Sequence, residues 1–212
     1  MNHEAVRREI VEAARALVDK GLVTGTSGNI SVRAGDAMLI TPSGIAPDRL
    51  MPEDMVKVSL ADGPETGDNP SSEWHFHRAI LATRAEAQAV VHTHSPYATA
   101  LSMTRRPIPA SHYMVALFGG AEVRCSAYAT FGTAELSDAA LAALEGRNAC
   151  LLANHGAITV GADLSRAMAL AVELEGLARQ HCIALSIGGP VLLSAAEMDA
   201  AIARFANYGP KD

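Results

Sequence analysis

Apolar side chains recur at helical spacing in residues 4–19, where Val6, Ile10 and Leu17 share one face and Gly21 follows at the expected end. This pattern predicts an amphipathic helix. Further helices are expected at residues 72–84, 96–102, 134–145, 163–185 and 194–206.

Shorter apolar and alternating runs between these helices predict strands. Residues 30–33 and 38–41 flank Ala34-Gly35-Asp36, which is typical of a hairpin turn. Residues 103–133 show no firm element, and so long an irregular interval in a compact domain is usually functional or part of an interface. Other strands are expected at residues 55–60, 89–94, 149–153 and 157–160, with a Gly-, Pro- and Asp-rich loop at residues 62–70.

The order of these elements indicates the fold class. Because the strands between residues 30 and 60 are contiguous and mostly joined by short links, we expect a largely antiparallel sheet in an α+β or three-layer αβα domain, not a doubly wound one. The length of 212 residues favours a single domain over residues 1–212, since domains average about 150 residues.

Composition and charge narrow the classes of function. Apolar residues make up 49% of the chain and charged residues 19%, as in globular proteins, and the net charge of −6 argues against a large basic nucleic-acid-binding face. Cys125, Cys150 and Cys182 are widely spaced without a CxxC motif, which argues against a disulfide framework and fits a cytoplasmic protein. Residues 1–19 and 167–187 contain too many charged or polar groups to predict a signal peptide or a membrane span.

Three histidines form a candidate metal site. His92 and His94 fall at i and i+2 of a predicted strand, so their imidazoles should stand side by side at about the separation that one metal ion bridges. His155, at the end of the apolar run 150–153, offers a third nitrogen, and three neutral histidines with an open position are typical of catalytic zinc. Structural histidines are the alternative, because an HxH pair alone is a weak signal.

Glu73 is a candidate general acid or base beside that site. Its alternative is structural: an acid at a helix start is favoured by the helix dipole, and Ser71 or Ser72 would be a good N-cap. His77 lies at i+4 and shares a face with Glu73, so it either orients the carboxylate or pairs with it structurally.

Segments of small residues provide a candidate anion site. Residues 24–29, residues 41–44 and Ser71-Ser72 combine hydroxyl groups with glycines that allow close backbone approach, although each segment alone is ordinary turn chemistry. Together with a metal site they suggest a small phosphorylated substrate. Tyr113 and Tyr208 each carry a hydroxyl that can donate a proton to an alkoxide, with packing as the alternative.

Five ordered motifs carry a resemblance that covers nearly the whole chain. They are Gly-Thr-Ser-Gly-Asn-Ile-Ser (25–31), Ile-Thr-Pro-Ser-Gly (40–44), Ser-Ser-Glu-Trp-x-x-His (71–77), His-Thr-His-Ser (92–95) and Asn-His-Gly (154–156). The set resembles the class II aldolase/adducin family, most closely its aldolases of the L-fuculose-1-phosphate type.

The resemblance implies a three-layer αβα sandwich, in the α/β class, around a central, mainly antiparallel sheet, and a cyclic homotetramer with sites at subunit interfaces. It implies Zn2+, or another divalent metal such as Mn2+ or Co2+, held by His92, His94 and His155, with Glu73 as the acid/base at the substrate carbon. Tyr113 from a neighbouring subunit would protonate the departing alkoxide. The remaining implied roles are phosphate binding by Thr26, Gly28, Asn29, Ser43, Gly44, Ser71 and Ser72, and substrate positioning by Phe131 and Tyr208.

The implied reaction is cleavage of a ketose 1-phosphate of the fuculose, 5-deoxyribulose or methylthioribulose type into dihydroxyacetone phosphate and an aldehyde. Three alternatives share the fold. A ribulose-phosphate 4-epimerase is disfavoured because those known to us carry Asp where Glu73 stands, and a methylthioribulose-1-phosphate dehydratase would need a glutamate near His112, for which Glu122 is a candidate. A non-catalytic adducin-like module would lack the full ligand set, which this chain keeps.

Overall fold

The computed structural model describes residues 3–205 of the chain. Its helices are α1 (Glu4–Asp19), α2 (Trp74–Thr83), α3 (Pro96–Ser102), α4 (Ala134–Leu144), α5 (Leu164–Ser186) and α6 (Ala195–Phe205), with the short 3-10 turns η1 (Pro52–Asp54) and η2 (Tyr113–Phe118). Its strands are β1 (Asn29–Ala34), β2 (Ala37–Ile40), β3 (Val56–Ser59), β4 (Gly63–Pro64), β5 (Ala89–Thr93), β6 (Ala149–Leu152) and β7 (Gly156–Gly161).

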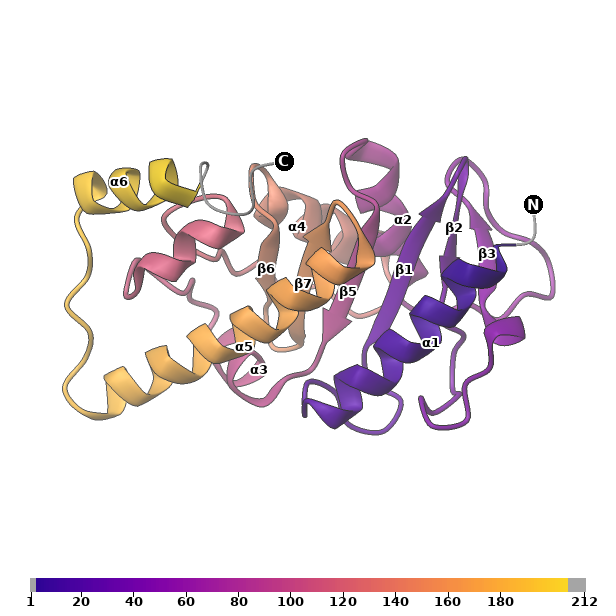
Figure 1. Cartoon of the computed structure of the whole chain (residues 1–212), viewed down its shortest axis with the longest axis horizontal. Coiled ribbons are helices and arrows are strands. Elements are labelled where there is room, and N and C mark those ends of the chain that lie inside the picture. Colours follow the sequence, from indigo (N-terminus) through magenta and orange to yellow (C-terminus); the bar gives the residue numbers. More distant parts are fainter. Residues whose placement is uncertain (1–2, 206–212) are drawn as a thin grey trace.

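The strands form one sheet in the order β4-β3-β2-β1-β5-β7-β6, and every neighbouring pair is antiparallel. Figure 1 shows α1 and α5 crossing one face of this sheet. Side chains from α2 and α4 cover the opposite face. The predicted fold class, a three-layer αβα sandwich with a mainly antiparallel sheet, is confirmed.

Alternation along the strands divides the core between the two faces. On β5, Val91 packs with α1 and α5, whereas its neighbour Val90 packs with α2 and α4. On β2, Leu39 and Met38 divide in the same way. Because successive strand side chains point to opposite faces, both layers of helices bury apolar surface against the same backbone.

The antiparallel pairing brings the sequence motifs together at one end of the strands. The start of β1 lies beside the ends of β2 and β5, with Asn29 opposite His92. The start of β7 lies beside the ends of β5 and β6, with Ala157 opposite Thr93. In an antiparallel pair the start of one strand lies beside the end of the next. Four motifs that are up to about 130 residues apart in sequence therefore meet at the same end of the sheet.

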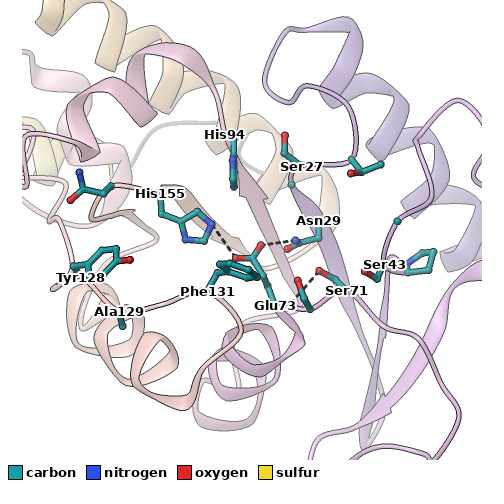
Figure 2. A pocket seen from close by; sticks show the side chains of 16 residues that line it. Ser27, Asn29, Ser43, Ser71, Glu73, His94, Tyr128, Ala129, Phe131 and His155 are labelled. Carbon is teal, nitrogen blue, oxygen red and sulfur yellow. Dashed lines mark hydrogen bonds and ion pairs between the residues drawn. The ribbon is translucent and has the colours of Figure 1, made fainter.

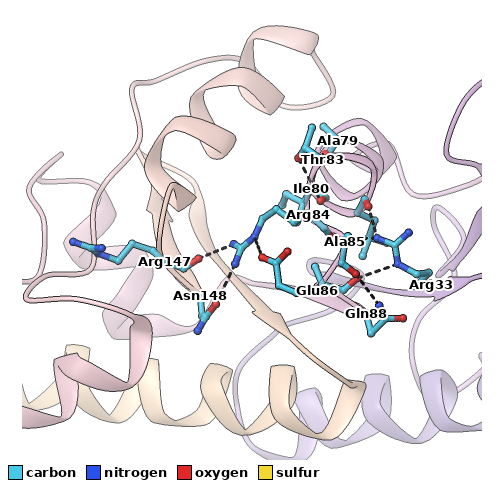
Figure 3. Close-up of polar contacts among 12 residues, drawn as sticks. Arg33, Ala79, Ile80, Thr83, Arg84, Ala85, Glu86, Gln88, Arg147 and Asn148 are labelled. Atoms are coloured by element: carbon cyan, nitrogen blue, oxygen red, sulfur yellow. Dashed lines mark hydrogen bonds and ion pairs between the residues drawn. The ribbon is translucent and has the colours of Figure 1, made fainter. Parts of the chain in front are cut away.

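At the opposite end of the strands, arginine side chains form hydrogen bonds between neighbouring segments (Figure 3). The Arg84 guanidinium, just beyond α2, donates to the carbonyl of Arg147 at 2.6 Å and to the side chain of Asn148 at 3.2 Å, and it forms an ion pair with Glu86. Arg33 of β1 donates to the carbonyl of Ala87 at 3.1 Å. These contacts join the end of α2 to the residues that directly precede β5 and β6.

Apart from one-residue shifts at the ends of other elements, the structure differs from the sequence prediction at three places. Helix α2 begins at Trp74, not at residue 72, so that Glu73 occupies the N-cap position. The expected loop 62–70 contains the two-residue strand β4, and the irregular segment 103–133 contains the 3-10 turn η2. Across residues 3–205, none of the helices combines the length and apolar character that crossing a bilayer requires.

Candidate active site

His92, His94 and His155 converge at the end of the sheet where β5 and β6 terminate. The three ring centroids lie 4.8 to 4.9 Å apart, and the Nε2 atoms of His92 and His94 are separated by 2.9 Å. His92 lies on β5 and His94 directly follows its last residue, so the two-residue spacing keeps both rings on the same side of the chain. His155 reaches them from the three-residue turn between β6 and β7.

Backbone and hydroxyl contacts aim these rings. Nδ1 of His92 lies 3.0 Å from the carbonyl of Ala157, so Nδ1 carries the proton and the Nε2 lone pair points at the other histidines. The Ser102 hydroxyl accepts a hydrogen bond from the backbone N–H of His155 at 3.3 Å. Gly156 completes the turn, and a Cβ there would lie 2.4 Å from the carbonyl of Thr93 and 3.1 to 3.2 Å from the two neighbouring imidazoles.

Glu73 points its carboxylate into the histidine cluster. Its Oε1 lies 3.0 Å from Nε2 of His155, and its Oε2 lies 3.2 Å from Nε2 of His92. Burial by itself raises the pKa of Glu73, but His92 and His155, when their rings are protonated in the metal-free site, outweigh burial and hold that pKa well below the usual range. The structural alternative, with Ser71 or Ser72 as the N-cap and Glu73 in the first turn, is wrong: Glu73 itself is the N-cap residue, and its side chain makes no capping hydrogen bond.

This donor set fits a divalent cation. One ligand atom from each of Glu73, His92, His94 and His155 lies within 4.8 Å of the others. Oε1 of Glu73 is buried without a hydrogen-bond donor in suitable geometry, which is costly unless a cation compensates it. Burial and the neighbouring His92 lower the pKa of His94 to about 4, so that ring is neutral and can serve as a ligand.

A cavity of about 410 Å³ opens beside this cluster. All of the residues predicted for phosphate binding line it, namely Thr26, Gly28, Asn29, Ser43, Gly44, Ser71 and Ser72. Figure 2 shows Ser27, Ser43 and Ser71 on one side, Tyr128 and Ala129 on the other, and Glu73 between them. The cavity therefore has a hydroxyl-rich wall and a wall with aromatic and aliphatic character.

Loop geometry explains the hydroxyl-rich wall. Gly28 and Gly44 both have positive φ angles, of 85° and 76°, a conformation in which glycine meets no steric penalty. At Gly28 a Cβ would also lie 2.9 Å from the carbonyl of His92. Among residues 3–205, the lining of this cavity includes no lysine or arginine, so an anion there would be held by hydroxyls, backbone N–H groups and a cation.

The other wall contains residues that sequence reasoning missed. Tyr128 and Asn154 both line the cavity. Arg105, which does not line the cavity, contacts both of them. Its Nε donates a hydrogen bond to the Asn154 side chain at 2.6 Å, and its guanidinium lies 5.4 Å from the centre of the Tyr128 ring. Asn154 stood inside a recognised motif, but Tyr128 and Arg105 lie in the irregular segment and had no local signal.

Of the three aromatic residues predicted for the site, Phe131, Tyr113 and Tyr208, only Phe131 is found at the cavity among the described residues. Phe131 lines the cavity and is exposed. Tyr113 does not line it: this side chain is 53% exposed in η2 and stacks on Phe205, with ring centroids 6.1 Å apart. Tyr208 lies outside the described residues.

Comparisons with known proteins identify the family of this chain. The family model for the class II aldolase and adducin N-terminal domain matches residues 8–182. A 5-methylthioribulose-1-phosphate/5-deoxyribulose-1-phosphate aldolase from Rhodospirillum rubrum is 53% identical over 97% of this chain and 93% of its own length. An L-fuculose phosphate aldolase from Escherichia coli O6:H1 is 43% identical over 99% of this chain and 98% of its own.

Solved structures give the same result. An L-fuculose 1-phosphate aldolase superimposes with a TM-score of 0.91 at 40% identity, covering 95% of this chain and 96% of that one. The chain belongs to the class II aldolase and adducin family, as its motifs indicated.

Proposed function

We propose that this protein is a divalent-metal-dependent aldolase that cleaves a ketose 1-phosphate into dihydroxyacetone phosphate and an aldehyde. The observation that carries the proposal is the convergence of three imidazoles and one buried carboxylate between the two walls of the cavity. The relatives named above are aldolases of sugar phosphates, which supports the same reaction class. Zn2+ is the metal we propose, because nitrogen and oxygen donors suit it.

The hydroxyl-rich wall would bind the substrate phosphate. Thr26, Ser43, Ser71 and Ser72 offer hydroxyl donors, and Gly28 and Gly44 lie in the same wall, where the backbone can approach an anion closely. Binding the phosphate there directs the sugar chain across the histidine cluster toward Tyr128 and Phe131. The aldehyde half would then contact the aromatic wall, with Phe131 and Tyr208 as positioning residues.

Glu73 would move the proton at the carbon next to the ketone. A bound cation would supply Lewis acidity, polarising the ketone and stabilising the negative charge that develops there. When the bond between the third and fourth carbons breaks, Glu73 donates a proton to the third carbon, and it removes that proton in the reverse direction. Its place 3.0 to 3.2 Å from two of the proposed ligand imidazoles supports this role.

Tyr113 would serve the oxygen on the fourth carbon. In cleavage its hydroxyl would accept the proton of the fourth-carbon hydroxyl, which becomes the aldehyde oxygen, and in condensation it would return that proton to the alkoxide. This corrects the implied role of protonating a departing alkoxide. Because Tyr113 is exposed and away from its own cavity, we propose that it enters the cavity of a neighbouring subunit in a homotetramer. The three cysteines are free, which supports a cytoplasmic location.

A substrate panel tests the reaction class. The zinc-loaded protein is incubated separately with L-fuculose 1-phosphate, 5-deoxyribulose 1-phosphate and 5-methylthioribulose 1-phosphate, and dihydroxyacetone phosphate is assayed enzymatically. We expect its release from at least one of them, with the matching aldehyde in equal amount. Epimerised or dehydrated product without dihydroxyacetone phosphate would show that the protein is a different enzyme of the same fold.

A further inference from the structure

A chain of buried side chains runs from β1 through α2 to the carboxylate of Glu73. The Ser31 hydroxyl lies 2.7 Å from Nδ1 of His77, Nε2 of His77 contacts Oδ1 of Asn29, and Nδ2 of Asn29 lies 2.9 Å from Oε2 of Glu73. Ser31 and His77 are completely buried, and Asn29 and Glu73 are each 6% exposed. Of these four residues, only Asn29 and Glu73 line the cavity.

The chemistry of the last member fixes the direction of every hydrogen bond. A carboxylate can only accept, so Asn29 must present its NH2 group to Glu73 and its carbonyl oxygen to His77. The His77 ring must then donate from Nε2 and accept from the Ser31 hydroxyl at Nδ1. Burial and the neighbouring His92 lower the pKa of His77 to about 3, which agrees with the neutral ring that this direction requires.

We propose that His77 is a positioning residue that fixes the amide orientation of Asn29. In that orientation one Asn29 N–H is bound to Glu73, and the second is available to the substrate phosphate. Asn29 therefore connects the anion site to the acid/base, and His77 keeps both connections in place. This inference rests on the proposed function for its catalytic consequence, but not for the geometry of the chain.

Loss of the Nε2 donor would free the amide of Asn29 to rotate. A rotated amide places Oδ1 against the carboxylate of Glu73 and takes the N–H donor away from the anion site. Both changes act on the cavity, although His77 itself does not line it. A buried histidine that only filled space would not have this effect.

Variants at His77 separate positioning from packing. His77→Leu removes the donor, whereas His77→Gln keeps an N–H near the position of Nε2. We expect His77→Leu to lower kcat about tenfold and to weaken binding of inorganic phosphate by a similar factor, as for loss of one buried hydrogen bond. His77→Gln should restore most of both, and His75→Leu, a half-buried position on the same helix, should change neither.

Nuclear magnetic resonance of the wild-type protein tests the geometry without any variant. With 15N-labelled histidine, we expect His77 to be a neutral ring protonated at Nε2 near neutral pH. A ring protonated at Nδ1, or a folded His77→Leu protein with wild-type kcat and phosphate affinity, would overturn the proposal. If the protein shows no aldolase activity, phosphate affinity and the tautomer still decide the role of His77, so the two proposals fail separately.

Discussion

Replacing Glu73 by Gln is expected to lower the rate of proton exchange at the substrate carbon by at least about 100-fold, the lower bound for loss of a general acid/base. The amide keeps the shape of the side chain and its contact with Asn29 but cannot accept and return a proton. Exchange of solvent deuterium into dihydroxyacetone phosphate, followed by nuclear magnetic resonance, measures this step without the aldehyde.

Glu9→Gln is the matched control for this experiment. It removes the same charge from an exposed position on α1 that does not line the cavity, and should leave exchange unchanged. The Glu73→Gln protein should still bind metal and inorganic phosphate. Wild-type exchange in a correctly folded Glu73→Gln protein would remove Glu73 from the acid/base role.

Replacing His155 by Ala is expected to weaken metal binding by at least about 100-fold, because it removes a proposed direct ligand, whereas loss of a residue behind a ligand already costs about 10- to 100-fold. The turn that carries His155 is held by backbone contacts that do not use the imidazole, including the bond from its N–H to the Ser102 hydroxyl. The protein should therefore fold and lose the metal together with aldol cleavage.

Two measurements check this result. Elemental analysis after dialysis should find one zinc per wild-type chain and almost none in the His155→Ala protein. Added zinc should raise the melting temperature of the wild type, since a ligand at 100 times its Kd stabilises by about 2.7 kcal/mol, but not that of the variant. His75→Ala, a histidine outside the cluster, should behave as the wild type, and equal metal content in His155→Ala would exclude His155 as a ligand.

Much of the site's location follows from the two-residue alternation of strand side chains and from the antiparallel pairing of the strands. The alternation of strand side chains places His92 and His94 together, and this needs only the HxH spacing on an apolar strand. Their meeting with His155 and Asn29 needs the antiparallel order of the sheet, which the contiguous strands indicated only for residues 30–60. The motif resemblance supplied the rest of that order.

Other features depended on tertiary contacts that carry no local pattern. Glu73 satisfied every local rule for a helix-start acid, yet its side chain turns toward imidazoles that lie on β5 and in the β6–β7 turn. Tyr128 and Arg105 lie in a segment without periodicity, where only the surrounding fold determines which side chains reach a cavity. The connection from His77 to Glu73 runs through Asn29, which spacing along α2 could not show.

The central claim is that one divalent cation, held by His92, His94 and His155, is required for cleavage of the substrate. The most direct test strips the wild-type protein with a strong chelator, verifies by elemental analysis that the metal is gone, and measures release of dihydroxyacetone phosphate before and after zinc is restored. We predict that release falls below about 1% and returns in proportion to bound zinc, up to one equivalent per chain. Full release from protein shown to be free of metal would contradict the account.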